Sequence, residues 1–87
     1  GDEMKSISIK DYNSSMGTLI DIEDAITYNK NHVPGAINIP YQELIYNFKS
    51  YLNPNECYYI YCRGGVKSRR AVSILEIYKY NVTQVLL

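Results

Sequence analysis

The sequence predicts an α/β domain of three layers, in which helices cover both faces of a mostly parallel central sheet. Apolar and β-branched runs typical of strands alternate along the chain with segments of helical character. This alternation is the order of elements found in parallel α/β folds. The 87 residues suffice for one small domain. No internal repeat, low-complexity tract or linker divides them, so we expect one core around a single sheet.

The first quarter of the chain predicts two strands separated by a polar segment. Residues 6–9 alternate between serine and isoleucine, which predicts a short strand. Residues 11–17 hold polar residues and turn formers, which is consistent with about one helical turn. Residues 18–22 form a β-branched, apolar run typical of a central strand. Asp21 interrupts this run near its carboxyl end.

The middle of the chain predicts two helices on either side of an extended segment. Residues 23–31 predict a short helix with acidic residues in its first turn, where the helix dipole favours them. Residues 32–40 contain a Pro-Gly turn and predict a brief strand over 36–38. Residues 41–52 predict an amphipathic helix, and Pro40 suits its start. Its apolar face consists of Leu44, Ile45, Phe48 and Leu52.

The last part of the chain predicts a strand, a helix and a final strand. Residues 57–61 form an apolar and aromatic run that predicts a strand. Residues 68–80 predict a helix, with Ser68 as its N-cap and Asn81 as the left-handed residue that ends it. Residues 82–87 predict the last strand of the sheet.

The composition is that of an ordinary globular domain and indicates no strongly charged partner. Apolar residues make up 46% of the chain, and nine basic residues balance nine acidic ones. We therefore expect neither nucleic acid nor a membrane as a partner. No apolar run approaches the roughly 20 residues that a membrane-spanning helix needs, and the first residues lack the apolar core of a signal peptide. The cytoplasm is the expected compartment, and Gly1 to Glu3 resemble a vector-derived extension before a domain at 4–87.

The two cysteines are not expected to pair with each other. In one extended strand, Cys57 and Cys62 would lie roughly 16 Å apart, whereas a disulfide needs Cα atoms within about 7 Å. Nothing near Cys57 activates its thiol, so we expect a structural role for it. His32 is the only histidine, and no group of Cys and His residues has the spacing of a metal site.

Cys62 ends a predicted strand and begins a basic turn that contains two glycines. In parallel sheets, ligands bind beyond the carboxyl ends of the strands. Gly64 and Gly65 allow successive N–H groups to point at an anion, and the next helix adds its positive N-terminal end. Lys67 and Arg69 add positive charge. Each of these features favours a thiolate over a thiol, so we predict that Cys62 is a nucleophile.

Two blocks of this sequence resemble the rhodanese-like domain family, specifically its single-domain sulfurtransferases. Residues 19–44 are similar to the family's Leu-Ile-Asp-Val-Arg segment and the His-Ile-Pro-Gly-Ala that follows it. Residues 59–72 resemble the family's Cys-x-x-Gly-x-Arg/Lys-Ser loop and the helix after it. Together the blocks cover about half of the chain, and the predicted order of elements fits the rest.

The resemblance implies a sulfurtransferase in which Cys62 carries sulfur as a persulfide. Cys62 would attack the outer sulfur of a small anionic donor such as thiosulfate and pass that sulfur to cyanide, a thiol or a protein acceptor. Lys67 would hold the anionic end of the donor, and no cofactor or metal is implied. Backbone amides would surround the persulfide, and they belong to Arg63, Gly64, Gly65, Val66, Lys67 and Ser68.

Other residues have supporting or divergent roles within this resemblance. We expect Asp21, His32 and Arg69 to support the site, with His32 in the structural block that shapes the neighbouring turn. Glu23 stands where the family usually has arginine, and this inverted charge is expected to loosen support for the loop. The chain ends at Leu87, where the family's Gly-Gly-x-x-x-Trp block and last helix would begin, so that C-terminal segment is expected to be absent.

Two other functions remain as alternatives at this stage. Cysteine phosphatases and arsenate reductases have a longer loop, with arginine six positions after the cysteine. Here Ser68 takes that position and Arg69 follows it, and the shorter loop suits a sulfur atom better than a tetrahedral oxyanion. A non-catalytic rhodanese-like binding or regulatory module is the other alternative. Such modules commonly lack the cysteine, so the presence of Cys62 favours an enzyme.

Overall fold

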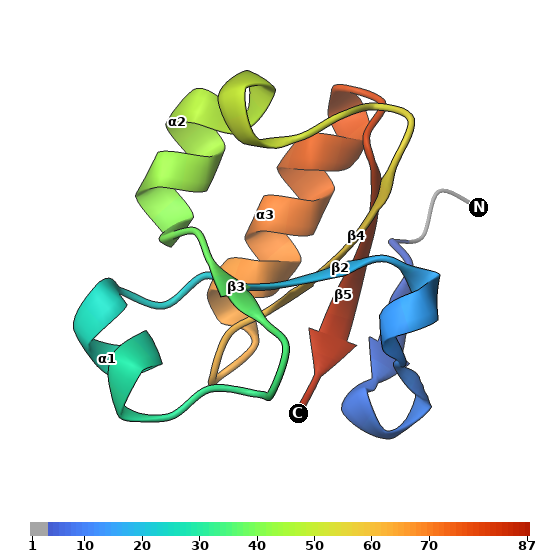
Figure 1. Cartoon of the computed structure of the whole chain (residues 1–87). Helices are drawn as coiled ribbons and strands as arrows, with labels where there is room; N and C mark the ends of the chain where they lie inside the picture. Colours follow the sequence, from blue (N-terminus) through green and yellow to red (C-terminus); the bar gives the residue numbers. More distant parts are fainter. Residues whose placement is uncertain (1–3) are drawn as a thin grey trace.

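The computed structural model describes residues 4–87, which fold around a five-stranded sheet in the order β1-β5-β4-β2-β3. Every neighbouring pair of strands is parallel, so the carboxyl ends of the strands share one edge. This confirms the predicted α/β class; the proposed extension at residues 1–3 lies outside the described residues. The strands are β1 (Ser6–Ser8), β2 (Thr18–Asp21), β3 (Ile37–Asn38), β4 (Cys57–Tyr61) and β5 (Asn81–Leu86) (Figure 1).

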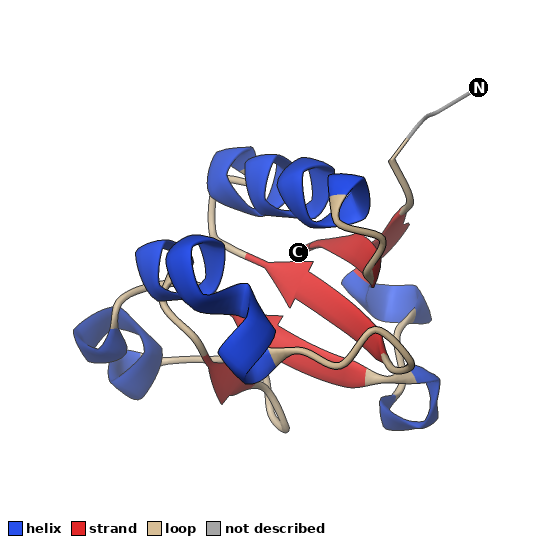
Figure 2. Cartoon of the chain, turned by 90° about the horizontal axis from the view of Figure 1, so that it is seen from above, coloured by secondary structure: helices blue, strands red, loops and turns tan. Residues whose placement is uncertain are grey.

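The longer helices lie on one face of the sheet, as Figure 2 shows. The α-helices are α1 (Ala25–Lys30), α2 (Tyr41–Tyr51) and α3 (Val66–Ile77). The polar segment between β1 and β2 forms two 3-10 turns rather than one, η1 (Ile9–Asp11) and η2 (Ser14–Met16). Within residues 4–87, no helix combines the length and the apolar character that crossing a membrane requires.

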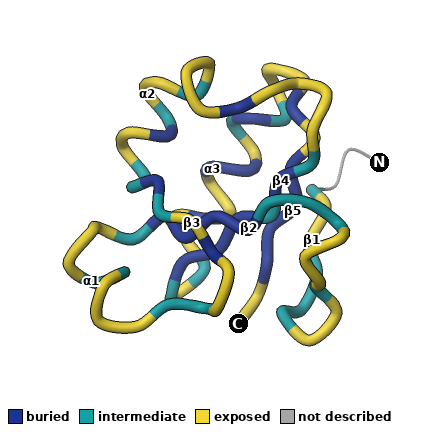
Figure 3. The backbone as a smooth tube through the Cα atoms, viewed as in Figure 1, coloured by how far each residue is buried: buried dark blue, intermediate teal, exposed yellow. Residues whose placement is uncertain are grey.

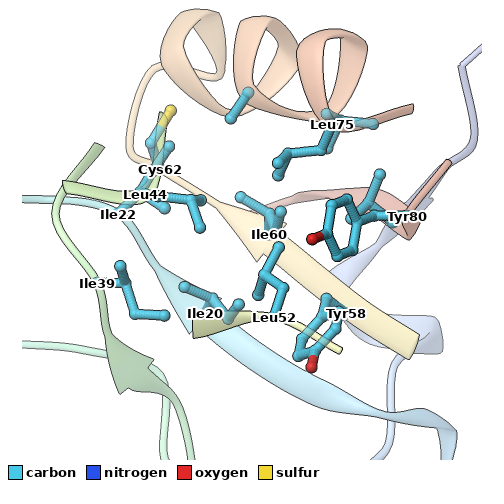
Figure 4. Close-up of a cluster of buried hydrophobic side chains, with 13 residues drawn as sticks. Ile20, Ile22, Ile39, Leu44, Leu52, Tyr58, Ile60, Cys62, Leu75 and Tyr80 are labelled. Carbon is cyan, nitrogen blue, oxygen red and sulfur yellow. The ribbon is translucent and has the colours of Figure 1, made fainter. Parts of the chain in front are cut away.

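The core is divided unequally between the two faces of the sheet. The larger cluster packs β2, β4 and β5 against α2 and α3, and Figure 4 shows many of its side chains. The smaller cluster has Leu19, Ala36, Tyr61 and Val85 at its centre. Side chains from β1, η1, α1 and their loops cover it, among them Ile9, Tyr12 and Tyr28. Figure 3 accordingly shows burial concentrated along the strands, while α1 is mostly exposed or half-buried.

The ends of α3 differ from those predicted. The helix begins at Val66, and its N-cap is Gly65, which has a left-handed backbone with φ of 84°. Ser68 therefore lies inside the first turn and is not the N-cap. Lys79, with φ of 71°, is the left-handed residue after the helix, and Asn81 already belongs to β5. The prediction was wrong at both ends because the glycine allows the chain to enter the helix sooner, while Lys79 adopts a conformation that lysine seldom takes.

Candidate active site at the end of β4

Cys62 directly follows β4 at the carboxyl edge of the sheet. Its side chain is buried, with 7% of the residue exposed, and it belongs to the larger core cluster. Figure 4 shows it at the margin of that cluster, near Ile22 and Leu44. The thiol therefore lies where parallel α/β sheets bind ligands, with apolar neighbours on the side of the core.

The first turn of α3 supplies the polar contacts of the Cys62 sulfur. The backbone N–H of Ser68 donates to Cys62 Sγ at 3.2 Å, and the Cys62 thiol donates to Ser68 Oγ at 3.3 Å. Ser68 itself is fully buried. The N-terminal end of a helix carries partial positive charge, so this arrangement favours negative charge on the sulfur.

The backbone of the loop is left-handed at Gly65. The φ of 84° is one that residues with a Cβ seldom adopt, and the Gly65 carbonyl accepts the N–H of Arg69 at 3.1 Å. A Cβ at Gly64 would meet nothing within 4 Å, and one at Gly65 would make only an ordinary contact of 3.7 Å with Gln84 Nε2. Gly65 is therefore required for its backbone conformation rather than for space.

Charged groups from β2 and the residues after it hold the start of the loop. The backbone N–H of Arg63 donates to Glu23 Oε2 at 2.7 Å, and Arg63 Nη1 donates to Asp21 Oδ2 at 3.1 Å. Arg63 Nη1 also lies 3.8 Å from Glu23 Oε2, and Nη2 donates to the Asn31 carbonyl. The expectation that Glu23 loosens the loop is therefore wrong, because its carboxylate binds the loop directly. The backbone N–H of Arg63 binds Glu23, so it does not belong to the expected ring of amides around the sulfur.

Asp21 is the buried centre of this charged anchor. It is 0% exposed, and its Oδ1 accepts the N–H of Glu23 at 2.8 Å. Its Oδ2 accepts the hydroxyl of Tyr61 at 2.6 Å, and the Tyr61 oxygen in turn accepts the N–H of Val33 at 3.0 Å. Burial, together with the hydrogen bond to the Asp21 carboxylate, raises the pKa of Tyr61 to about 12. Asp21 thus joins Tyr61 on β4 to Arg63 at the start of the loop.

Sequence reasoning missed Tyr61, because the sequence showed only that Asp21 needs a donor, while the structure shows which strand supplies it. An aspartate inside an apolar strand needs donors when it is buried. The parallel register places Tyr61 directly beside Asp21 on the neighbouring strand.

A second missed residue, Gln84, holds the other end of the loop from β5. It is 5% exposed, and its Nε2 donates to the Gly65 carbonyl and to Ser68 Oγ, both at 2.9 Å. Ser68 Oγ also donates to the Gly65 carbonyl at 3.2 Å. The signal in the sequence was an amide side chain within the otherwise mostly apolar run 82–87.

The remaining predicted residues lie further from the sulfur. Lys67 Nζ is 5.9 Å from the centre of the Tyr41 ring. Arg69 makes no ion pair with any residue that the structure describes. His32 stacks on Tyr28 with ring centres 3.8 Å apart, and its Nδ1 lies 2.8 Å from the Tyr28 carbonyl oxygen. The observed contacts of His32 are thus with α1 rather than with Cys62.

Two hollows flank the loop. One of about 270 Å³ lies between the loop and the end of β5; it is lined by Cys62, Arg63, Gly64, Gly65, Val85, Leu86 and Leu87. Another of about 290 Å³ lies towards α1 and α2, and its walls include Lys67, Glu23, Asp24 and Tyr41. Cys62 contributes to the first hollow, which is large enough for a small sulfur compound, and its β5 wall is apolar. Lys67 faces the second, where two carboxylates accompany it.

Comparison with known proteins places this geometry in a family. The family model described as the rhodanese-like domain matches residues 3–87. A rhodanese-related protein from Thermoplasma volcanium is 28% identical with a TM-score of 0.84, over 93% of this chain and 82% of that one. A rhodanese-like domain protein from Staphylococcus aureus is 31% identical with a TM-score of 0.81, over 94% and 84% of the two chains.

A similar fold also occurs within a much longer chain. The reduced CoADR-RHD protein from Bacillus anthracis is 25% identical with a TM-score of 0.82, over 94% of this chain but only 15% of that one. No curated protein matches this chain significantly.

Proposed function

This chain belongs to the rhodanese-like domain family, and we propose that it is a sulfurtransferase that carries sulfane sulfur as a persulfide on Cys62. The observation that carries this proposal is the position of the Cys62 sulfur, which accepts the N–H of Ser68 at 3.2 Å in the first turn of α3. A backbone amide at a helix N-terminus stabilises an ionised sulfur, and the partial positive charge of the same helix end favours the anionic terminal sulfur of a persulfide.

The first half-reaction would load sulfur onto the enzyme. The Cys62 thiolate attacks the outer sulfur of thiosulfate, a Cys62 S–S bond forms, and the bond from that sulfur to the sulfonate sulfur breaks. Sulfite leaves with the electron pair of the broken bond, and Cys62 becomes a persulfide anion. The hollow between the loop and β5 is the candidate place for the donor, since Cys62 and the loop backbone line it.

The second half-reaction would return the thiolate. Cyanide attacks the terminal sulfur of the persulfide, the S–S bond breaks, and thiocyanate leaves while Cys62 keeps the electron pair as a thiolate. A thiol acceptor would instead leave as a persulfide of its own. Splitting one transfer into two displacements at sulfur is covalent catalysis. The two free cysteines fit a reducing compartment such as the cytoplasm.

Mass spectrometry after incubation with thiosulfate tests the proposal directly. We expect a mass gain of one sulfur atom on Cys62 that dithiothreitol reverses. The Cys62→Ala variant should show neither this gain nor thiosulfate:cyanide transfer. Cys57→Ala is the matched control, since Cys57 lies at the opposite end of β4, and it should keep most of the activity.

Other results would favour one of the two alternative functions. The proposal fails if the folded wild-type protein gains no sulfur while it hydrolyses para-nitrophenyl phosphate in a Cys62-dependent way. That result would favour the cysteine phosphatase alternative. Absence of both activities in the folded protein would favour a binding module.

A further inference from the structure

Gln84 approaches the loop from β5, on the side opposite to Glu23, and its contacts are neutral and buried. From these contacts we propose that Gln84 is a positioning residue that frees the Ser68 hydroxyl to donate its proton to the sulfur of Cys62. Its importance for sulfur transfer rests on the proposed function, whereas its effect on the reactivity of Cys62 does not.

In the thiol form, every proton in the network has an acceptor. The Cys62 thiol donates to Ser68 Oγ, and the Ser68 hydroxyl donates to the Gly65 carbonyl. Gln84 Nε2 donates to both the Gly65 carbonyl and Ser68 Oγ. Ser68 Oγ therefore accepts two hydrogen bonds and donates one, which fills the capacity of a hydroxyl group.

Ionisation of Cys62 removes the proton that its thiol gave to Ser68 Oγ. The Ser68 hydroxyl can then rotate from the Gly65 carbonyl towards Cys62 Sγ, which lies 3.3 Å away. The sulfur would then accept two hydrogen bonds from Ser68, one from its N–H and one from its hydroxyl. Hydrogen bonds to a charged acceptor are stronger than those between neutral groups.

Gln84 makes this rotation favourable. When the Ser68 hydroxyl turns away, the Gly65 carbonyl keeps the donors of Gln84 and of the Arg69 N–H. Gln84 also continues to donate to Ser68 Oγ, which orients the lone pairs of that oxygen away from the sulfur. Without Gln84, the Gly65 carbonyl would compete more strongly for the single proton of Ser68.

Alkylation of Cys62 by iodoacetamide tests the proposal without any sulfur donor. The experiment uses the Cys57→Ala background, in which Cys62 is the only thiol. Gln84→Met keeps an unbranched side chain of similar size but removes both donors. We expect alkylation at neutral pH to slow about five-fold. The slowing should vanish in alkaline buffer, where the sulfur is ionised with or without Gln84.

A double-mutant cycle separates positioning from support of the sheet. In a Ser68→Ala background, Gln84→Met should have little further effect on the rate, because no hydroxyl remains to be oriented. Thr83→Val is the matched control: Thr83 is equally buried, and adjacent strand residues face opposite sides of the sheet. It should leave alkylation unchanged.

Two results would overturn the proposal. One is equal slowing by Gln84→Met with and without the Ser68 hydroxyl, and the other is unchanged alkylation in the folded variant. Gln84→Leu, which is of similar size, carries no charge and also removes the Nε2 donors, provides the same test if the methionine variant does not fold. If alkylation behaves as expected while thiosulfate adds no sulfur, the sulfurtransferase proposal fails and the positioning role stands.

Discussion

Arg63, which follows Cys62 at the start of the loop, is held by charged groups, whereas Ser68, near the other end of the loop, is held by neutral ones. Asp21 and Glu23 bind the guanidinium and the backbone of Arg63, whose side chain is 37% exposed. Gln84 reaches Ser68 in a fully buried setting and brings no formal charge. The two ends of one short loop thus depend on different interactions.

The two ends of the loop differ in how much negative charge can lie near them. A carboxylate beside the sulfur would oppose its ionisation, because like charges repel strongly away from water. At the Arg63 end, the guanidinium offsets the charges of Asp21 and Glu23. At the Ser68 end, the donors within residues 4–87 that contact the sulfur or its hydrogen-bond partner are all neutral. The loop therefore combines a strong ionic anchor with an uncharged setting for the thiol.

The largest expected effect comes from breaking the charged anchor at its buried centre. Asp21→Asn removes the charge that balances Arg63. It also replaces one carboxylate oxygen by an NH2 group, so a donor that bound this oxygen loses its acceptor. We expect the free energy of unfolding to fall by about 2 kcal/mol, because hydrogen bonds to a buried charged acceptor are weakened and one buried donor loses its partner. Urea unfolding measures this change.

Asp24 provides the matched control for Asp21. It is exposed, and its carboxylate caps α1 by accepting the N–H of Thr27 at 2.8 Å. Because asparagine caps helices about as well as aspartate does, Asp24→Asn should change stability by less than about 0.5 kcal/mol. Similar losses of unfolding free energy in the two variants would mean that the buried Asp21 stabilises the fold no more than the exposed Asp24 does.

A smaller effect is expected when Glu23 is replaced by the arginine that the family usually has there. Glu23→Arg removes the acceptor of the Arg63 N–H and sets two guanidinium groups close together. We expect the rate of persulfide formation to fall about ten-fold, since the loop loses a hydrogen bond to a charged group.

Glu23→Gln separates the charge of this residue from its hydrogen bond. The glutamine carbonyl can still accept the Arg63 N–H, so most of the activity should remain. A faster reaction in Glu23→Arg than in wild type would show that Glu23 does not support the loop of this protein.

The strands and the position of Cys62 after one of them could be predicted because local patterns encode them. The aromatic run at 57–61 became β4 with the predicted bounds, and Cys62 lies at its end as expected. The short helix at 23–31 and the amphipathic one at 41–52 also form, as α1 and α2, within two residues of their predicted ends. These elements depend on residues close together in sequence.

The two anchors could not be predicted because they depend on strand order. β4 lies between β2 and β5 in the sheet, so residues from both neighbours flank the loop. Glu23 is 40 positions from Arg63, and Gln84 is 16 positions from Ser68. No local pattern indicates which strands become neighbours. The error at Ser68 has a local cause, since Gly65 adopts the left-handed conformation that starts α3 earlier.

The smallest expected effect concerns the pH dependence of the charged anchor, through Tyr61. Its pKa in the folded protein is raised to about 12 by burial and by the hydrogen bond to Asp21, from an ordinary value of 10.0. The neutral phenol is therefore favoured by folding, so its contribution to stability is fully present below pH 10.0 and is lost as pH rises towards about 12.

Tyr61→Phe removes this contribution, along with the hydrogen bonds to Asp21 and Val33. The variant should be less stable than wild type at neutral pH, and the difference between the two should shrink above pH 10.0. Urea unfolding of both proteins between neutral and alkaline pH measures it, and titration of the other tyrosines largely cancels in the comparison. A constant difference across that range would show that neither burial nor Asp21 raises the pKa of Tyr61 in the folded protein, and Tyr61 would then add no pH dependence to the charged anchor.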